Sequence, residues 1–328
     1  MFVSPTVVGD AVIIGSCAGS LYSLERTTGS PIWLYDTNAD GSVGNFHGEP
    51  LIHGERLIIP SDSDPKGHLY SFDIASGEMQ WKLPFNYGVA TTPLLIGDVL
   101  AVVSAEGDVA AVEAKSGRVV WRVRPAGTLK PNPFIPSPAY AANRILVADN
   151  TNQILALDPA SGATLWRKTL SARANTSLVV VGDKVVVGTF DGYLNWIAIK
   201  SGDLKKRVQL GGIPHGTPVP SGALLLVLTS TGKSSLVALD AESGKIRWEQ
   251  QTPKEWTTYR PLVTGSLVIV GNNDKDLCAF DRTSGEPRWC RPVGQTPRGL
   301  GISEDGILYV GSLSGVVQAF RVRTAQPR

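Results

Sequence analysis

The sequence predicts an all-β protein, an eight-bladed β-propeller of four-stranded antiparallel blades whose last blade lacks its outer strand. Three observations lead to this fold. A short phrase recurs every 40 to 48 residues, each repeat contains short apolar runs separated by turn residues, and no segment keeps a 3.6-residue helical period. Four-stranded antiparallel sheets repeated radially form a propeller. Seven blades remain the alternative, because the phrase occurs seven times.

The recurring phrase ends in Gly, and a Trp usually follows four positions later. The glycines are Gly29, Gly77, Gly117, Gly162, Gly202, Gly244 and Gly285, and the tryptophans are Trp33, Trp81, Trp121, Trp166, Trp248 and Trp289. An acidic residue usually lies four positions before the Gly. We expect its carboxylate to accept backbone N–H groups of the turn, the Gly to supply a positive φ, and the Trp to cover the seam to the neighbouring blade.

The repeat that contains Gly202 departs from this phrase. It has Ala198 at the acidic position and Lys206 at the Trp position. Trp196, two residues before Ala198, is expected to fill a related space, and we predict a weaker seam at this blade.

The first repeat shows how one blade is built. Apolar runs at Pro5–Val8, Ala11–Gly15, Leu21–Glu25 and Pro31–Tyr35 predict four strands joined by Gly-containing turns. The second run recurs at Leu57–Ile59, Val99–Val103, Ile145–Ala148, Val185–Gly188, Leu224–Leu228, Leu267–Gly271 and Ile307–Gly311. The third run recurs at Leu69–Asp73, Val109–Glu113, Ile154–Asp158, Leu194–Ala198, Leu236–Asp240, Leu277–Asp281 and Val316–Phe320. The first three strands thus occur eight times and the fourth only seven.

Composition is consistent with one repeat-built domain over residues 1–328. Apolar residues make up 42% and charged residues 18% of the 328, which allows a large core. The net charge of +2 argues against nucleic acid as a partner, because such binding needs a clustered basic face. The longest apolar run, Ala223–Leu228, is too short for a transmembrane segment. We expect a monomer.

The three cysteines are Cys17, Cys278 and Cys290, and their odd number argues against a disulfide framework. Cys278 and Cys290 flank one predicted hairpin, so a bond between them is an alternative. Two-residue alternation about the turn at Arg282–Gly285 favours opposite faces of the sheet, where bridging is impossible. Small buried thiols are therefore expected.

The phrase acid-x-x-[Ser/Thr]-Gly-x-x-x-Trp, as in Asp158–Trp166, resembles the tryptophan-docking motif of quinoprotein-type (PQQ-like) β-propellers over nearly the whole chain. That family includes PQQ-dependent dehydrogenases. It also includes non-catalytic relatives, such as sensor domains and the lipoprotein of the bacterial outer-membrane barrel-assembly machinery, which this chain resembles most in style. The resemblance implies that a strand upstream of Met1 completes the last blade, with a leader or lipid anchor there too. It implies a periplasmic or cell-envelope protein, or a cytoplasmic one if Met1 is the native start.

The resemblance to PQQ-dependent dehydrogenases implies a calcium ion, a catalytic Asp, a stacking Trp and a disulfide between adjacent cysteines. This chain has no Cys-Cys pair, and its even repeat spacing leaves little room for pocket-building insertions. We therefore predict no catalytic residue, no metal site and no cofactor, with PQQ and calcium as the alternative.

Other catalytic signatures are weak. Gly15–Gly19 imitates a nucleophile elbow with Cys17 as the nucleophile, but it falls in a strand-to-strand turn and is interpreted as structural. The four histidines lack metal-ligand spacing. Ser61–Pro65 is interpreted as a solvated turn rather than a calcium loop.

A binding site is predicted at the rim of the central channel. The residues that precede the innermost strands are Ser4, Glu49, Thr92, Ser137, Ser177, Thr217 and Arg260. All but Glu49 and Arg260 are small hydroxyl residues. The candidate rim residues are Glu49, Arg260, Arg298, His47, His215, Arg173 and Tyr259. Such a rim suits a carboxylate or an acidic peptide. Alternatively, Glu49 and Arg260 pair with each other and simply cap the channel.

These observations predict a non-catalytic scaffold that binds protein partners, in the bacterial envelope or in outer-membrane protein assembly. The alternatives are a PQQ- and calcium-dependent dehydrogenase and a sensor propeller that binds a small ligand. A second binding mode is strand addition at the incomplete last blade, Leu300–Phe320.

Overall fold

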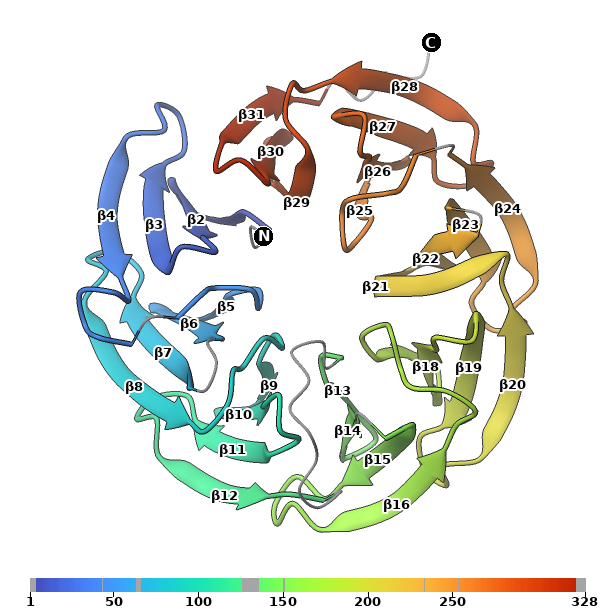
Figure 1. The fold of residues 1–328 in the computed structure, drawn as a ribbon, viewed down its shortest axis with the longest axis horizontal. Helices are drawn as coiled ribbons and strands as arrows, with labels where there is room; N and C mark the ends of the chain where they lie inside the picture. Colours follow the sequence, from blue (N-terminus) through green and yellow to red (C-terminus); the bar gives the residue numbers. More distant parts are fainter. Residues whose placement is uncertain are drawn as a thin grey trace.

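The computed structural model is a ring of eight antiparallel sheets arranged around a central axis (Figure 1). It describes residues 4–42, 44–62, 66–125, 136–149, 151–232, 234–252 and 254–322. All regular elements in these residues are β-strands, as predicted. Seven sheets have four strands and the last has three, which confirms the eight-bladed ring and rules out seven blades.

The blades follow one another in chain order. Blades 1 to 4 comprise β1 (Thr6–Val8), β2 (Ala11–Gly15), β3 (Ser20–Glu25), β4 (Pro31–Asp36), β5 (Leu51–His53), β6 (Arg56–Ser61), β7 (Gly67–Asp73), β8 (Met79–Phe85), β9 (Leu94–Ile96), β10 (Val99–Val103), β11 (Val109–Glu113), β12 (Val119–Val123), β13 (Ala139–Ala141), β14 (Arg144–Ala148), β15 (Gln153–Leu157) and β16 (Thr164–Thr169).

Blades 5 to 8 continue the series. They comprise β17 (Val179–Val181), β18 (Lys184–Gly188), β19 (Tyr193–Ala198), β20 (Leu204–Gln209), β21 (Gly212–Ser221), β22 (Leu224–Gly232), β23 (Ser235–Asp240), β24 (Ile246–Gln251), β25 (Leu262–Thr264), β26 (Leu267–Gly271), β27 (Asp276–Asp281), β28 (Pro287–Pro292), β29 (Pro297–Ile302), β30 (Ile307–Ser312) and β31 (Val317–Arg321).

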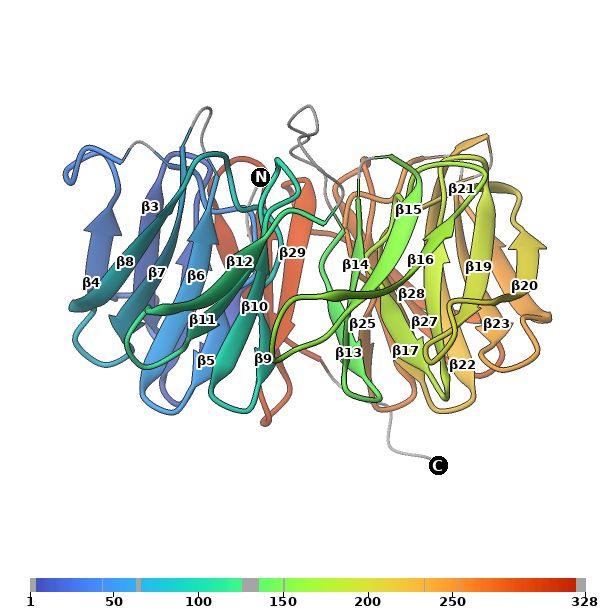
Figure 2. The same ribbon diagram turned by 90° about the horizontal axis from the view of Figure 1, so that it is seen from below.

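Each blade runs from an inner strand near the axis to an outer strand at the circumference (Figure 1), and the blades stand side by side (Figure 2). Because the strands alternate in direction, the turn between the second and third strands lies on the same face as the connection into the next blade. We call this face the entry face. It gathers loops from every blade, whereas the sheets below it are fixed by packing.

Apolar side chains fill the space between neighbouring blades. Between blades 5 and 6, for example, Val186 and Trp196 pack with Leu225 and Val237, and all four side chains are almost completely buried. Similar clusters recur around the ring, so its stability rests on blade-to-blade burial of apolar surface.

The tryptophans of the repeated phrase lie in these seams. One of the six, Trp289, packs against the apolar cluster between blades 7 and 8. In the other five, the indole Nε1 donates a hydrogen bond of 2.8 to 3.1 Å to a backbone carbonyl of the next blade, pairing Trp33 with Ile74, Trp81 with Ala114, Trp121 with Pro159, Trp166 with Ile199 and Trp248 with Arg282. The phrase Gly of that next blade lies beneath the indole. A Cβ at Gly77 would approach the ring of Trp33 to 2.5 Å. The Gly is therefore needed twice, for its positive φ and for its missing side chain.

Trp196 takes over this role between blades 5 and 6. It comes from β19 rather than from the outer strand, and its Nε1 donates to the carbonyl of Ala241 at 2.9 Å. Lys206, which stands at the usual Trp position, donates to the carbonyl of Glu242. Trp196 thus fills the related space, as expected.

The acidic residue of the phrase works as expected where it is Asp. Asp73 and Asp158 each accept two backbone N–H groups of the following turn at 2.8 to 3.1 Å. Glu25 and Glu113 instead accept from side chains, among them Thr27 and Ser116. The longer glutamate side chain carries its carboxylate past the backbone N–H groups and onto the hydroxyls.

Blade 6 departs from the predicted strand pattern. Thr217 was expected just before an inner strand, but it lies within β21, which begins at Gly212. The pairing of β21 with β22 shifts register between His215 and Val219. This bulge lets the strand extend beyond the usual inner-strand length, and regular pairing resumes two residues after Thr217.

The expectation that Cys278 and Cys290 remain thiols is wrong, because they form a disulfide. A register shift between Ala279 and Phe280 adds one residue to the hairpin and brings Cys290 directly opposite Cys278. The simple alternation counted from the turn missed this bulge. The bond joins β27 to β28 in the outer half of blade 7.

Thiol counting tests this disulfide. Alkylation of the denatured, unreduced protein is expected to modify one cysteine, Cys17, and alkylation after reduction should modify three. Intact mass and peptide mapping give both counts. Three modified cysteines before reduction would contradict the bond.

Candidate functional site

The residues at the start of the inner strands form a hydrogen-bonded belt around the channel on the entry face. Backbone N–H groups donate to the hydroxyl of the next blade at 3.1 to 3.4 Å, from Glu49 to Thr92, from Thr92 to Ser137 and from Ser137 to Ser177. The hydroxyl of Thr217 continues the belt to Ser177 at 3.2 Å. Small hydroxyl residues therefore link successive blades at the start of the inner strands.

Glu49 and Arg260, the charged members of this belt, face each other. Arg260 Nη1 lies 3.4 Å from Glu49 Oε2, while Ser4 donates to the other carboxylate oxygen at 2.8 Å. Blades 2 and 7 are thereby connected across the channel mouth. The arginine side chain is still 54% exposed, so the pair offers a polar surface to a partner as well as a cap.

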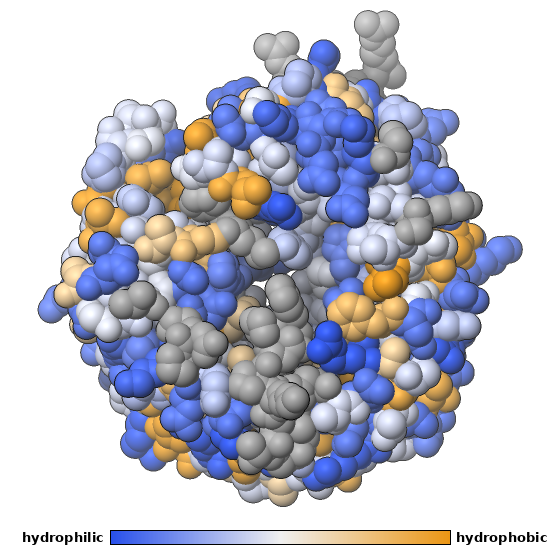
Figure 3. Space-filling model, viewed as in Figure 1, coloured by the Kyte–Doolittle hydropathy of each residue, from blue (hydrophilic) through white to orange (hydrophobic). Residues whose placement is uncertain are grey.

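The other predicted rim residues do not converge on one pocket. Arg173 lies over the ring of Phe190, with its guanidinium carbon 4.7 Å from the centroid. Arg298 donates to the carbonyl of Thr257 at 3.5 Å, and Tyr259 is 39% exposed. Burial lowers the pKa of His215 to about 4, so this side chain is neutral at pH 7. Around the centre of the ring, hydrophilic and hydrophobic residues are interspersed rather than gathered in one patch (Figure 3).

His47 lies in a different constellation. Its Nδ1 is 2.8 Å from Asp62 Oδ2, and its Nε2 is 3.3 Å from Cys17 Sγ. Cys17 lies in the turn between β2 and β3, as expected, and Asp62 directly follows β6. Sequence reasoning treated these two turns as structural, and Asp64 of the second lies outside the described residues. The available signal was the position of His47, on the connection that passes between the two turns.

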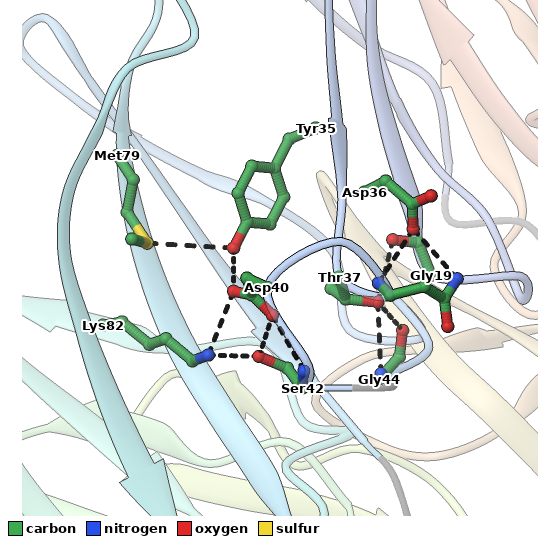
Figure 4. A network of polar contacts seen from close by, with 10 residues as sticks. Gly19, Tyr35, Asp36, Thr37, Asp40, Ser42, Gly44, Met79 and Lys82 are labelled. Carbon is green, nitrogen blue, oxygen red and sulfur yellow. Dashed lines mark hydrogen bonds and ion pairs between the residues drawn. The ribbon is translucent and has the colours of Figure 1, made fainter.

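A polar network holds this connection in place (Figure 4). The Thr37 hydroxyl lies 3.0 and 2.9 Å from the carbonyl oxygens of Gly19 and Gly44 and shares its one proton between them, which ties the connection to the β2–β3 turn. Beside it, Asp40 accepts from Tyr35, Ser42 and Lys82. Burial alone would raise the pKa of Asp40, but hydrogen bonds from Ser42, Tyr35 and Lys82 outweigh it and lower the pKa to about 2.

The lowered pKa of Asp40 gives a pH prediction. Its pKa rises to about 3.9 on unfolding, so its stabilising effect is complete above pH 4 and is lost as the pH falls toward 2. Asp40→Asn is expected to flatten the fall in melting temperature between pH 4 and pH 2, while Glu304→Gln, an exposed carboxylate in blade 8, should leave it unchanged. Parallel slopes for wild type and Asp40→Asn would contradict the role of Asp40.

The seam between blades 8 and 1 differs from the others. A Cβ at Gly29 would meet nothing within 4 Å, although its φ of +74° matches that of the other phrase glycines. The carbonyl of Arg26, in the position that accepts an indole elsewhere, is 3.4 Å from the hydroxyl of Tyr309. A groove of about 690 Å³ runs from Gly29 along the apolar face of β2 and β3 to β31. The groove lies where a tryptophan would pack if this eighth seam were built like the others.

The described residues form no cluster of acidic side chains or histidines and no vicinal disulfide of the kind that the dehydrogenase resemblance implies. Within them, no group of three or more His, Cys, Asp or Glu side chains is placed to hold a metal ion. The disulfide lies in the outer strands of blade 7 and joins cysteines twelve positions apart. At the channel mouth, Glu49 and Arg260 engage each other.

None of the described segments forms a helix long and apolar enough to span a membrane.

The chain is similar in sequence to curated proteins and in fold to solved structures. Outer membrane protein assembly factor BamB of Alkalilimnicola ehrlichii is 30% identical over 204 residues, which cover 58% of this chain and 50% of that protein. The crystal structure of BamB from Moraxella catarrhalis has a TM-score of 0.78 at 19% identity, covering 98% of this chain and 96% of that one. A europium-containing methanol dehydrogenase has a TM-score of 0.68 at 14% identity, covering 94% and 81%. These two structural likenesses show the fold alone.

The chain spans about half the length of the curated relatives it matches. A family model described as outer membrane protein assembly factor BamB, however, matches residues 2–123 and 105–326, which together are nearly the whole sequence. The chain therefore belongs to the family of the outer membrane protein assembly factor BamB.

Proposed function

We propose that this protein is a non-catalytic propeller scaffold that binds protein partners during assembly of outer-membrane proteins in the bacterial envelope. The observation that carries the proposal is the family match over both halves of the ring. The pairing of Glu49 with Arg260 at the channel mouth, with the arginine side chain half exposed, supports a binding surface. PQQ-dependent oxidation remains the alternative to be tested.

The entry face is the proposed partner surface. The Glu49–Arg260 pair is anchored by Ser4 but leaves the Arg260 side chain half exposed, and Arg298 lies on the adjoining blade. Two arginines on neighbouring blades at the rim suit the carboxylates of an acidic protein segment. The edge of β31 is a second place where a partner strand can pair through its backbone.

Deletion of the gene from its host tests the proposed function. We expect less folded outer-membrane β-barrel protein, measured by heat-modifiable migration on gels, and recovery with the wild-type gene. The purified protein incubated with PQQ and Ca²⁺ is expected to show no dye-linked alcohol oxidation. Unchanged barrel assembly together with PQQ-dependent turnover would overturn the proposal.

Charge removal at the rim tests the proposed surface. Arg260→Ala with Arg298→Ala is expected to reduce co-purification of partner proteins from the host envelope at least several-fold. Arg288→Ala is the matched control, because this exposed arginine pairs with Asp281 on the outer strand of blade 7. Equal recovery of partners with both variants would place binding elsewhere on the ring.

A further inference from the structure

The entry face carries a nucleophile, a base and an orienting carboxylate in line. From the arrangement of Cys17, His47 and Asp62, we propose that Cys17 is a reactive thiol that exchanges with disulfides, with His47 as its base and Asp62 as a positioning residue. This activity goes beyond the proposed scaffold role and does not depend on it.

The tautomer of His47 follows from its two contacts. Asp62 Oδ2, 2.8 Å away, is a strong acceptor, so Nδ1 carries the proton and donates it to this carboxylate. Nε2 is then left as the acceptor that faces Cys17 Sγ at 3.3 Å. A thiol beside such a base can transfer its proton and become the nucleophilic thiolate.

The backbone holds all three residues in this geometry. Asn45 and Asp62 exchange two backbone hydrogen bonds of 2.8 Å, and the next residue, Phe46, donates to the carbonyl of Ser16 at 3.1 Å. Phe46 itself is fully buried. The segment that carries His47 is thus held on one side by Ser16, next to Cys17, and on the other side by Asp62. These bonds fix His47 between the two residues, and a reactive site needs such preorganisation.

The arrangement does not suit metal binding or acyl transfer. His47 uses both ring nitrogens, one toward each neighbour, so the three side chains do not converge on one point. The N–H groups of Ala18, Gly19 and Ser20 all point to Ser16 oxygens at 3.0 to 3.3 Å. They are therefore engaged and supply no oxyanion hole, which an acyl substrate requires and attack on a disulfide sulfur does not.

The site is open to a reactant. Cys17 is partly exposed and Ala18 beside it is exposed, and the side chains of His47 and Asp62 are 25% and 16% exposed. On the same β4–β5 connection as His47, Asp40 pairs with Lys82 and Glu49 pairs with Arg260.

The exchange is balanced without another reactant. The Cys17 proton moves to His47 Nε2, and the sulfur attacks one sulfur of the incoming disulfide. The old S–S bond breaks as the Cys17–S–S bond forms, and the departing thiolate takes the proton from Nε2. Cys17 is oxidised to a mixed disulfide, and the leaving sulfur is reduced to a thiol.

Kinetics with 4,4′-dithiodipyridine test the proposal on the intact protein. An ordinary thiol has a pKa near 8.5, whereas we expect the rate of wild-type Cys17 to titrate clearly below that value. A lower pKa raises the fraction of Cys17 present as thiolate at pH 6, but it also makes that thiolate a weaker nucleophile. Together the two effects are expected to give a rate about tenfold above that of an ordinary thiol at pH 6. Cys17→Ser should abolish the reaction.

Variants separate activation from simple exposure. His47→Gln is expected to slow the reaction at pH 6 about tenfold and to return the pH profile to an ordinary thiol, and Asp62→Asn should move it the same way. His53→Gln, on β5 beside Asp98, is the matched control and should change nothing. A wild-type profile with an ordinary thiol pKa overturns the proposal without any variant, as does a rate unaffected by both His47→Gln and Asp62→Asn.

Discussion

Replacing Trp196 by Ala is expected to lower the free energy of unfolding by about 3–5 kcal/mol, the range for a fully buried large aromatic side chain. Trp196 has no exposed surface, packs between blades 5 and 6, and its Nε1 bonds the Ala241 carbonyl. The substitution leaves a cavity and removes this hydrogen bond. Urea denaturation followed by circular dichroism measures the change.

Leu204→Ala is the control for this experiment, because Leu204 lies on the neighbouring strand β20 with its side chain exposed. Its substitution should alter the free energy of unfolding by only about 0.5 kcal/mol. Trp166→Ala provides the comparison with an ordinary seam. The sequence predicts a weaker seam at blade 5, whereas the burial of Trp196 predicts a loss at least as large as that for Trp166→Ala. If Trp196→Ala lowers the free energy of unfolding by less than about 1 kcal/mol, the prediction of a weaker seam is correct after all.

The repeat explains why most of the fold was predictable from sequence and part of the site was not. A phrase such as Asp158–Trp166 fixes a turn and a seam locally, so its period reveals the blades. The disulfide depended on a one-residue bulge beside Cys278, which leaves no period-two signal. Cys17, His47 and Asp62 are brought together from two blades by packing, and their spacing along the chain carries no known motif. The entry residues were predicted by position, but the belt that joins Ser137 to Ser177 and Thr217 appears only in the structure.

The second large effect on stability is expected from a pair of phrase glycines, one of them at the seam between blades 8 and 1. Both lie in the same kind of turn, but their surroundings differ. Gly77 and Gly29 have φ values of +72° and +74°, so an alanine at either costs about 1–2 kcal/mol in the left-handed region. At Gly77 the new Cβ would also meet Trp33 at 2.5 Å, which adds about 1–3 kcal/mol of overpacking. Gly77→Ala is therefore expected to cost about 2–5 kcal/mol and Gly29→Ala only about 1–2 kcal/mol.

Urea denaturation of the two variants shows whether a side chain packs on Gly29 in the eighth seam. The backbone strain is common to both variants, so it cancels when their losses of unfolding free energy are subtracted. A smaller loss for Gly29→Ala means that the groove beside Arg26 is open and that β31 keeps an edge to which another strand can be added. Gly9→Ala, at a φ of +56° with nothing near its Cβ, calibrates the strain alone. Equal losses at Gly29 and Gly77 would contradict the open seam, since only a side chain packed on Gly29 would make its alanine as costly. The comparison thus tests whether the surface proposed for strand pairing at blade 8 is available to a partner.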